Sequence, residues 1–266
     1  MRPSMLIVAE NDETWMVEPL SRLVARSFRC TVRRAGSIRS GDLRWIAGMS
    51  VTFLRSRSTA LLRALDGIDA GGGLVVNRPC AVRRARHRTT ALAIAAAGGV
   101  PTARDYEGPL ASIPFPRAVV KRRFDDGRSR PVLYERGRTA GRADRIVHAQ
   151  ELIDSPWEHK IYVVGDELFA FEQRPTLNHP DKLATRRRVP VDAVLGARAR
   201  RVAEAVGLEV AGVDFLFDRG EPKVTDVNSN QGLHTFSEGY QALEAYLLGR
   251  VRRARSCGED VATAAG

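Results

Sequence analysis

The segment that most constrains the fold of this chain is residues 212–228, which reads as two strands joined by a tight turn. The sequence Arg-Gly-Glu at 219–221 forms a three-residue loop and carries the glycine that loops of this length require. That register places Asp218 opposite Pro222. The segment therefore predicts a β-hairpin whose strands pair in a defined register.

Two carboxylates and one carboxamide converge on one patch of this hairpin. The same register sets Asp214 opposite Asp226, and Asn228 lies two residues further along on the same face. Opposed like charges destabilise a sheet unless something neutralises them. Oxygen ligands of this kind suit Mg²⁺, which combines a few protein carboxylates with phosphate oxygens. The hairpin therefore predicts a Mg²⁺ site, and the alternative is a solvated hairpin with scattered acids.

The composition is that of an ordinary globular protein. Of its 266 residues 44% are hydrophobic, yet no apolar run is long enough to cross a bilayer. The apolar run at residues 5–9 is too short for a signal peptide and reads as a buried strand. Cys30, Cys80 and Cys257 are odd in number and far apart, so neither a disulfide framework nor a zinc site is expected. We expect a cytoplasmic protein.

The charge of the chain is strongly positive, at +11, and 38 of its 42 basic residues are arginines because only Lys121, Lys160, Lys182 and Lys223 are lysines. The arginines are spread through the whole chain, and aromatic residues make up only 6% of it. Stacking platforms for bases, with aromatic and basic residues interleaved, are missing. Nucleic-acid binding is therefore not favoured, whereas a polyanionic substrate or an acidic peptide partner is compatible with the charge.

Strands and helices alternate over the first part of the chain, which predicts a small parallel α/β lobe. The expected strands and helices are strands at 5–10, 29–33, 51–54 and 74–76 and helices at 14–26 and 59–65.

The remainder mixes helices with hairpins. The expected elements are a helix at 81–97, two strands within 117–138 around a turn at 125–127, a strand at 146–153, a hairpin at 160–171 turning at Gly165-Asp166, a helix from the N-cap Asp192 to Gly207, and a helix at 240–252. Dinucleotide, Walker and nucleophile-elbow motifs are absent. The five histidines show no metal-ligand spacing and are expected at the surface or as helix caps.

Seven pieces stand in a characteristic order: Val75-Val76-Asn77-Arg78-Pro79, Arg88, Phe115 to Lys121, Gln150 to Ile153, Glu158, the hairpin between Lys160 and Arg174, and the acidic hairpin. This series resembles the ATP-grasp superfamily, specifically its RimK-like carboxylate–amine ligases and glutathione synthetase relatives. The resemblance runs from about Val75 to Leu248, with a compatible lobe before it.

The resemblance implies a role for each matching residue. Arg88 stands where a nucleotide-contacting lysine is usual, and Lys121 resembles the lysine that reaches the phosphates of ATP. The other implied roles are adenine binding by Gln150, Glu151 and Leu152, ribose binding by Glu158, phosphate binding and catalysis by Lys160, catalysis by Arg174, and binding of Mg²⁺, or alternatively Mn²⁺, by Asp214, Asp226 and Asn228. Asn230-Gln231-Gly232 replaces the usual small-Pro-Gly turn.

The implied architecture combines α/β and α+β parts. A parallel α/β lobe at 1–79 precedes an ATP-grasp domain at 80–252. That domain clamps ATP between a lid lobe at about 115–153 and a C-terminal lobe at about 154–252, and residues 253–266 form a frayed tail.

The implied activity is phosphorylation of a carboxylate by ATP, followed by attack of an amine on the acyl phosphate. Peptide tailoring with a small or acidic peptide fits this chemistry. Two other interpretations stay open: a kinase of a polyol phosphate on the same scaffold, and a non-catalytic nucleotide-binding scaffold. The acid, the amine and the oligomeric state, with a dimer as one option, also stay open.

The lid departs from the family pattern. ATP-grasp proteins usually carry a glycine-rich loop after the lysine strand, whereas this chain has Asp125-Asp126-Gly127 flanked by the arginines Arg122, Arg123, Arg128 and Arg130. Arginines can neutralise phosphates in place of backbone amides. We therefore expect a short basic hairpin that folds over the triphosphate, with a solvated hairpin tip as the alternative.

Overall fold

The computed structural model of the chain describes residues 1–10, 14–125, 131–137, 144–175, 177, 182–229 and 232–264, with side chains left out at 14, 15 and 257–264. The chain forms two compact units. The first comprises Met1–Arg83, Val164–Glu167 and Asn230–Gly266, and the second Arg84–Val163 and Leu168–Ser229. The C-terminal helix thus groups with the N-terminal lobe, whereas the sequence assigned residues up to 252 to the ATP-grasp domain.

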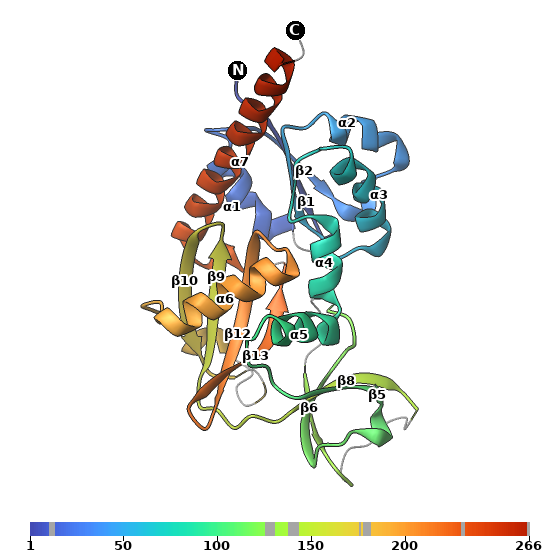
Figure 1. Cartoon of the computed structure of the whole chain (residues 1–266), viewed down its shortest axis with the longest axis vertical. Coiled ribbons are helices and arrows are strands. Elements are labelled where there is room, and N and C mark those ends of the chain that lie inside the picture. The colour runs from blue at the N-terminus through green and yellow to red at the C-terminus, as the bar shows by residue number, and fades with distance from the viewer. Residues whose placement is uncertain are drawn as a thin grey trace. The chain divides into compact units, whose positions relative to one another are not determined.

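The first unit contains the predicted parallel sheet. Its strands are β1 (Ser4–Ala9), β2 (Arg29–Arg34), β3 (Val51–Arg55) and β4 (Val75–Val76), in the order β2-β1-β3-β4. Helices α1 (Thr14–Val24), α2 (Leu43–Ala47) and α3 (Thr59–Ala70) belong to the same unit (Figure 1). Residues Met5 to Ala9 of β1 are all buried, as expected for the central strand of a parallel sheet. The predicted parallel α/β lobe is confirmed.

The last helix, α7, runs from Ser237 to Ala264. The sequence predicted its end at Arg252 and a frayed tail from 253, but the helix continues through that segment. Tyr240 anchors it by donating a hydrogen bond to the carbonyl of Met16 on α1. In the described residues no helix is both long and apolar enough to cross a membrane.

The second unit begins with two helices where the sequence predicted one. Helix α4 (Pro79–Arg86) and helix α5 (Arg88–Ala97) are separated by His87, whose backbone is extended at φ −87° and ψ 102°. The His87 side chain accepts a hydrogen bond from the Thr90 N–H, and its backbone forms a bridge with Phe124. His87 is therefore an N-cap. The break places Arg88 at the first position of α5.

A four-stranded antiparallel sheet follows, in the order β5-β8-β6-β7. Its strands are β5 (Asp105–Pro109), β6 (Arg117–Lys121), β7 (Val132–Glu135) and β8 (Ile146–Glu151). One face packs on a small core of Leu110, Ile113, Phe115, Ala118, Val120, Tyr134, Val147 and Ala149. The sequence analysis missed β5, whose Gly108 and Pro109 are poor strand formers. The turn predicted at 125–127 lies in the connection between β6 and β7. Val120 pairs with Val132 on either side of it, and residues 126–130 lie outside the described residues.

The other sheet has five strands, in the order β11-β10-β9-β12-β13. The strands are β9 (Glu158–Val164), β10 (Glu167–Gln173), β11 (Arg187–Val189), β12 (Val210–Asp218) and β13 (Glu221–Asn228). Helix α6 (Ala193–Val206) packs on β12 and on α5 (Figure 1). Its ends are as predicted: Asp192 accepts a hydrogen bond from the Leu195 N–H, and Gly207 closes the helix in the left-handed region at φ 88°.

Candidate active site

The turn of the β12–β13 hairpin differs from the prediction. It is a two-residue turn in which Arg219 and Gly220 both have positive φ, at 51° and 87°. Asp218 consequently pairs with Glu221, and the predicted pairing with Pro222 is wrong. Two positive φ values in succession are typical of the type I′ turn, whose twist matches that of the flanking strands. The three-residue loop was therefore the wrong turn type.

The predicted pairing of Asp214 with Asp226 is nevertheless confirmed. A β-bulge lies between Asp214 and Phe215, because Phe215 pairs with Val224 and leaves Thr225 as an extra residue on β13. The shorter turn shifts the register by one residue, and the bulge shifts it back. The two aspartates thus face each other because of the bulge and not because of the loop length.

The bulge also turns the Thr225 carbonyl towards the four-stranded sheet. That oxygen accepts one hydrogen bond from the Lys121 ammonium at 3.1 Å and another from the Gln150 amide at 2.8 Å. The Thr225 hydroxyl donates to the backbone oxygen of Asp214 at 3.3 Å. One irregular residue thus connects the acidic hairpin to β6 and β8, which carry two of the predicted nucleotide-binding residues.

The buried Arg88 and the half-buried Lys160 neutralise the two opposed carboxylates. Asp214, which is 6% exposed, forms an ion pair with the Lys160 ammonium of β9. Asp226 pairs with the Arg88 guanidinium at 2.5 Å, and Arg88 also reaches Asp125 at 3.2 Å. The repulsion that the sequence predicted is therefore relieved by the protein itself. The sequence analysis named both Arg88 and Lys160 as nucleotide contacts, but it did not foresee that each would pair with an aspartate.

These surroundings shift the pKa values of the two aspartates in opposite directions. Burial, with the charges of Glu158 and Asp226, raises the pKa of Asp214 to about 6 despite its partner Lys160. For Asp226 burial acts in the same sense, but Arg88 and Lys121 outweigh it and hold its pKa below the ordinary range. Paired carboxylates with divergent pKa values in a polar cluster are typical of functional sites.

The donors fit a hard divalent cation that is shared with phosphate. Asn228 lies on the same face of β13 as Asp226, so the predicted set supplies oxygen atoms only. Among the described residues no group of three His, Cys, Asp or Glu side chains could hold a metal by itself. Both ion pairs use the Oδ1 atom of their aspartate. Mg²⁺ or Mn²⁺ would therefore need further oxygen ligands, from phosphate or water, and would compete with Arg88 and Lys160.

The predicted adenine segment forms the end of β8. Glu151 pairs with Arg104 at 2.5 Å, and its N–H donates to the Arg104 carbonyl at 2.9 Å. The Leu152 N–H donates to the Arg117 carbonyl at 3.2 Å. Both backbone donors are therefore already used inside the sheet, and the buried Gln150 side chain is bonded to the hairpin. Nucleotide binding by Gln150, Glu151 and Leu152 remains a prediction.

Two further predicted residues lie on β9 and at the end of β10. The Glu158 carboxylate accepts a hydrogen bond from the Gln173 amide at 2.6 Å. The Arg174 guanidinium lies 4.2 Å from the centroid of the Trp157 ring and donates to the Pro156 carbonyl at 3.1 Å. Neither of these two contacts of Arg174 involves Asp214 or Asp226. The stacking fixes the guanidinium, while its catalytic role remains a prediction.

A second polar cluster, which the sequence analysis missed, lies behind Lys121. His148 pairs with Lys121 across β6 and β8, and its side chain is fully buried, so its assignment to the surface or to a helix cap is wrong. Its Nδ1 lies 3.2 Å from the Thr89 hydroxyl, which also donates to Glu107 at 2.9 Å. Burial lowers the pKa of His148 to about 3, with the charges of Lys121 and Arg88 acting in the same sense. The place of His148 on a strand between two apolar residues was the only available signal.

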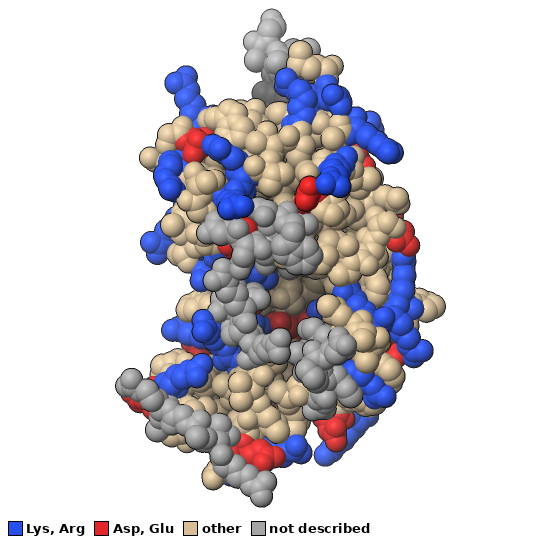
Figure 2. Space-filling view, turned by 180° about the vertical axis from the view of Figure 1, so that it is seen from behind, with Lys and Arg blue, Asp and Glu red and all other residues tan. Residues whose placement is uncertain are grey.

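The distribution of charge agrees with the expectation from the sequence. Lys and Arg side chains are spread over the face of the molecule seen in Figure 2 and do not gather in one large patch. Among the described residues on this view there is no continuous basic track of the kind that binds a nucleic-acid backbone.

The comparisons with known proteins are structural. No protein-family model and no curated protein matches the sequence. Solved ligases resemble it closely in fold: the ATP-grasp ligase PsnB complexed with a minimal precursor, Mg and ADP has a TM-score of 0.70 at 18% identity, covering 93% of this chain and 97% of PsnB.

Two further solved structures also resemble this chain in fold. A RiPP-associated ATP-grasp ligase from Chryseobacterium gregarium, in complex with ADP and a leader and core peptide, has a TM-score of 0.70 at 12% identity and covers 94% of this chain and 97% of that one. D-alanine–D-alanine ligase from Bacillus anthracis complexed with ATP has a TM-score of 0.68 at 12% identity, covering 96% and 99%. The resemblance expected from the sequence is confirmed at the level of the fold: this chain has the ATP-grasp fold.

Proposed function

We propose that this chain is an ATP-dependent ligase of the RimK-like kind, which joins a carboxylate to an amine through an acyl phosphate. The observation that carries the proposal is the pair of opposed aspartates, Asp214 and Asp226, enclosed by the cations Arg88, Lys121 and Lys160. Acids that hold a cation and bases that hold phosphates are what phosphoryl transfer requires. The similar structures include ligases with nucleotide bound.

Each cluster has a part in this reaction. A carboxylate oxygen of the substrate attacks the terminal phosphorus of ATP and ADP leaves; the amine then attacks the acyl carbon, phosphate leaves and the amine loses a proton. Lys121 and Lys160 bind the phosphate oxygens, and Arg174, held by Trp157, stabilises the charge on the acyl centre. Mg²⁺ or Mn²⁺ bound at the aspartates and Asn228 would neutralise phosphate charge.

The nucleotide is held at the end of β8 in this proposal. Gln150, Glu151 and Leu152 contact the adenine, Glu158 contacts the ribose, and Arg88 contacts the phosphates when it exchanges Asp226 for nucleotide. An acidic peptide is the substrate class that the arginine-rich composition favours, and two of the similar ligases were solved with precursor peptides.

One observation supports the rival function of a non-catalytic nucleotide-binding protein. Both aspartates already have buried cationic partners, so a metal has to displace or share them. Metal-dependent turnover decides between the two functions. A kinase differs in its product, because a phosphate ester is stable whereas an acyl phosphate reacts with hydroxylamine to give a hydroxamate.

The decisive experiment measures ATP turnover with an acidic peptide and hydroxylamine, comparing the wild type with Lys121→Ala and Lys223→Ala. Lys223 is the matched control because it is also a half-buried lysine but pairs mainly with Asp218 at the hairpin tip, at 2.6 Å, with the Glu151 carboxylate further away at 3.8 Å. Loss of a charged contact to phosphate costs about 1.5–3 kcal/mol, so turnover by Lys121→Ala should fall by roughly 10- to 150-fold. Similar small losses at both lysines would refute the phosphate contact, and absence of hydroxamate would refute the ligase.

A further inference from the structure

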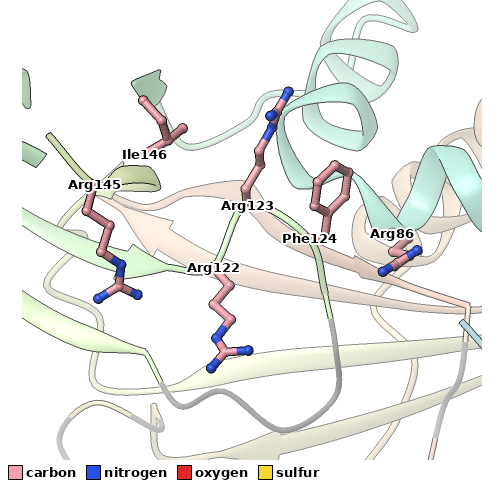
Figure 3. A pocket seen from close by; sticks show the side chains of 6 residues that line it. All are labelled: Arg86, Arg122, Arg123, Phe124, Arg145 and Ile146. Carbon is pink, nitrogen blue, oxygen red and sulfur yellow. The ribbon is translucent and has the colours of Figure 1, made fainter. Parts of the chain in front are cut away.

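A cavity of about 630 Å³ lies beside β6 and β8 in the second unit, at the end where Lys121 stands. This is the size of pockets that bind small molecules or peptide side chains. Its walls come from the end of α4, the segment after β6 and the start of β8 (Figure 3). The described residues that line it are Arg86, Arg122, Arg123, Phe124, Arg145 and Ile146. Four of these six are arginines, so the cavity favours an anionic ligand.

Phe124 organises two of the arginines. Its ring centroid lies 5.4 Å from the Arg86 guanidinium and 5.2 Å from that of Arg123. Arg123 also forms an ion pair with Glu107 at 2.6 Å. Ring contacts and the ion pair restrict both side chains before any ligand arrives, which reduces the entropy lost on binding. Arg122 and Arg145 extend on the other side of the strands, as Figure 3 shows.

The cavity also has an apolar component. Phe124 is 42% exposed and Ile146 is 51% exposed, although both are large hydrophobic residues. Cations beside exposed apolar side chains suit a ligand that carries both carboxylates and carbon stems, as aspartate and glutamate side chains do. A bare phosphate chain has no groups for the apolar part of this wall.

The lining residues adjoin the candidate active site along the chain. Arg122 directly follows Lys121, and Arg86 stands two residues before Arg88. Both neighbours have carboxylate or carbonyl partners on β13, Lys121 at Thr225 and Arg88 at Asp226. The cavity and the candidate active site are therefore built on neighbouring residues of the same two segments.

We propose that this arginine pocket binds an acidic peptide segment of the carboxylate substrate, through guanidinium–carboxylate pairs and contacts with Phe124 and Ile146. This inference rests on the proposed ligase function and assigns its substrate site. Arginine is suited to the role because its planar fork pairs with both oxygens of a carboxylate.

The test is fluorescence anisotropy of a fluorescein-labelled glutamate–leucine peptide with the full chain, for the wild type and for Arg122→Gln, Arg145→Gln and the double variant. The control is Arg117→Gln, because Arg117 and Arg145 are both exposed and stand at the starts of neighbouring strands, but only Arg145 lines the cavity. Each cavity variant should bind the peptide roughly tenfold more weakly, and the double variant more weakly still. Arg117→Gln should match the wild type.

Binding of AMPPNP with Mg²⁺, measured by calorimetry on the same proteins, separates this inference from the proposed function. The expected result is unchanged nucleotide affinity in Arg145→Gln, which lies outside the basic hairpin expected over the triphosphate, and a peptide that AMPPNP does not displace. Equal peptide affinity in Arg117→Gln and Arg145→Gln would overturn the inference and leave the ligase function intact. Loss of AMPPNP affinity in Arg145→Gln, or displacement of the peptide by AMPPNP or tripolyphosphate, would assign the pocket to the triphosphate and also overturn it.

Discussion

The two sheets of the second unit both bury ionisable groups, and they do so in opposite ways. The five-stranded sheet favours the charged forms of Asp214 and Asp226 by giving each a cationic partner, Lys160 and Arg88. The four-stranded sheet keeps His148 uncharged, since burial and nearby cations lower its pKa to about 3. In the proposed reaction the two aspartates with cationic partners act on the ligand, whereas the neutral His148 fills the interior.

In the proposed reaction this difference also separates residues that contact the ligand from residues that support the fold. In the proposed function a metal would take the place of a paired cation at the carboxylate, so the five-stranded sheet would change its interactions without leaving a bare buried charge. His148 instead stays neutral: its Nδ1 lies 3.2 Å from the Thr89 hydroxyl, which donates to Glu107, and 3.7 Å from the Asp105 carboxylate. Four predictions test this comparison.

The largest effect is expected at the ion pair. Asp226→Asn should abolish metal-dependent ATP turnover, and it should also destabilise the fold by about 3–5 kcal/mol, because Arg88 is left buried with Asp125 as its remaining carboxylate. Urea denaturation and turnover are the measurements. If the two aspartates only repelled each other, the variant would be more stable than the wild type, because removing one of two like charges would stabilise the sheet.

The double variant Arg88→Gln/Asp226→Asn is the control. It removes both charges of the pair, so it should recover a large part of the lost stability while remaining inactive. If the single variant is as stable as the wild type, the ion pair is not what neutralises the hairpin.

Deletion of Thr225 tests the connection between the two sheets. Without the extra residue the strands can still pair Asp214 with Asp226, but Lys121 and Gln150 lose their common carbonyl acceptor. An unsatisfied buried donor costs about 1–3 kcal/mol, so the free energy of unfolding should fall by a few kcal/mol.

Thr225→Ser is the matched control, because it keeps the bulge and a hydroxyl. It should cost less than about 1 kcal/mol. Equal stability of the deletion variant and Thr225→Ser in urea would show that the bulge carbonyl does not link the sheets.

The fold was largely predictable from the sequence, and the reasons differ from region to region. Residues Met5 to Ala9 form a continuous apolar run, and buried parallel strands require such runs. Asp192 and Gly207 are cap residues whose local chemistry alone determines the ends of α6. By contrast, β5 has a weak strand sequence and is held by its pairing with β8, which is a tertiary effect.

The site was predictable only in its list of acids. Asp214 and Asp226 could be paired from the hairpin pattern. The bulge at Thr225 could not be predicted, because the two-residue turn and the pairing of the aspartates require registers that differ by one residue, and the strand sequences do not show which turn forms. Arg88 and Lys160 could be named as cations, while their pairing with the aspartates requires the folded chain.

A smaller effect is expected at the neutral histidine. The folded state keeps His148 unprotonated down to about pH 3, whereas the unfolded chain binds a proton near its ordinary pKa of 6.5. The unfolded state therefore holds more protons between these values, and stability falls as the pH is lowered, by at most about 1.4 kcal/mol per pH unit. His148→Gln should show a shallower decrease between pH 6.5 and 4 in urea titrations. Parallel curves for both proteins would mean that His148 is charged in the folded state.

The smallest effect is expected at the hairpin turn and decides between the two turn types. Arg219 has φ 51°, a conformation that asparagine adopts more readily, and Asn-Gly is the preferred pair for a type I′ turn. Arg219→Asn should therefore raise the free energy of unfolding by about 0.5–1 kcal/mol. Glu221→Asn is the informative control, because residue 221 is a loop position in the predicted three-residue turn but the first residue of β13 in the structure. Asparagine is unfavourable in strands, so this variant should be neutral or slightly destabilised in the same urea titration. Stabilisation by Glu221→Asn and not by Arg219→Asn would restore the three-residue loop, and with it a hairpin in which Asp214 meets Asp226 without any bulge.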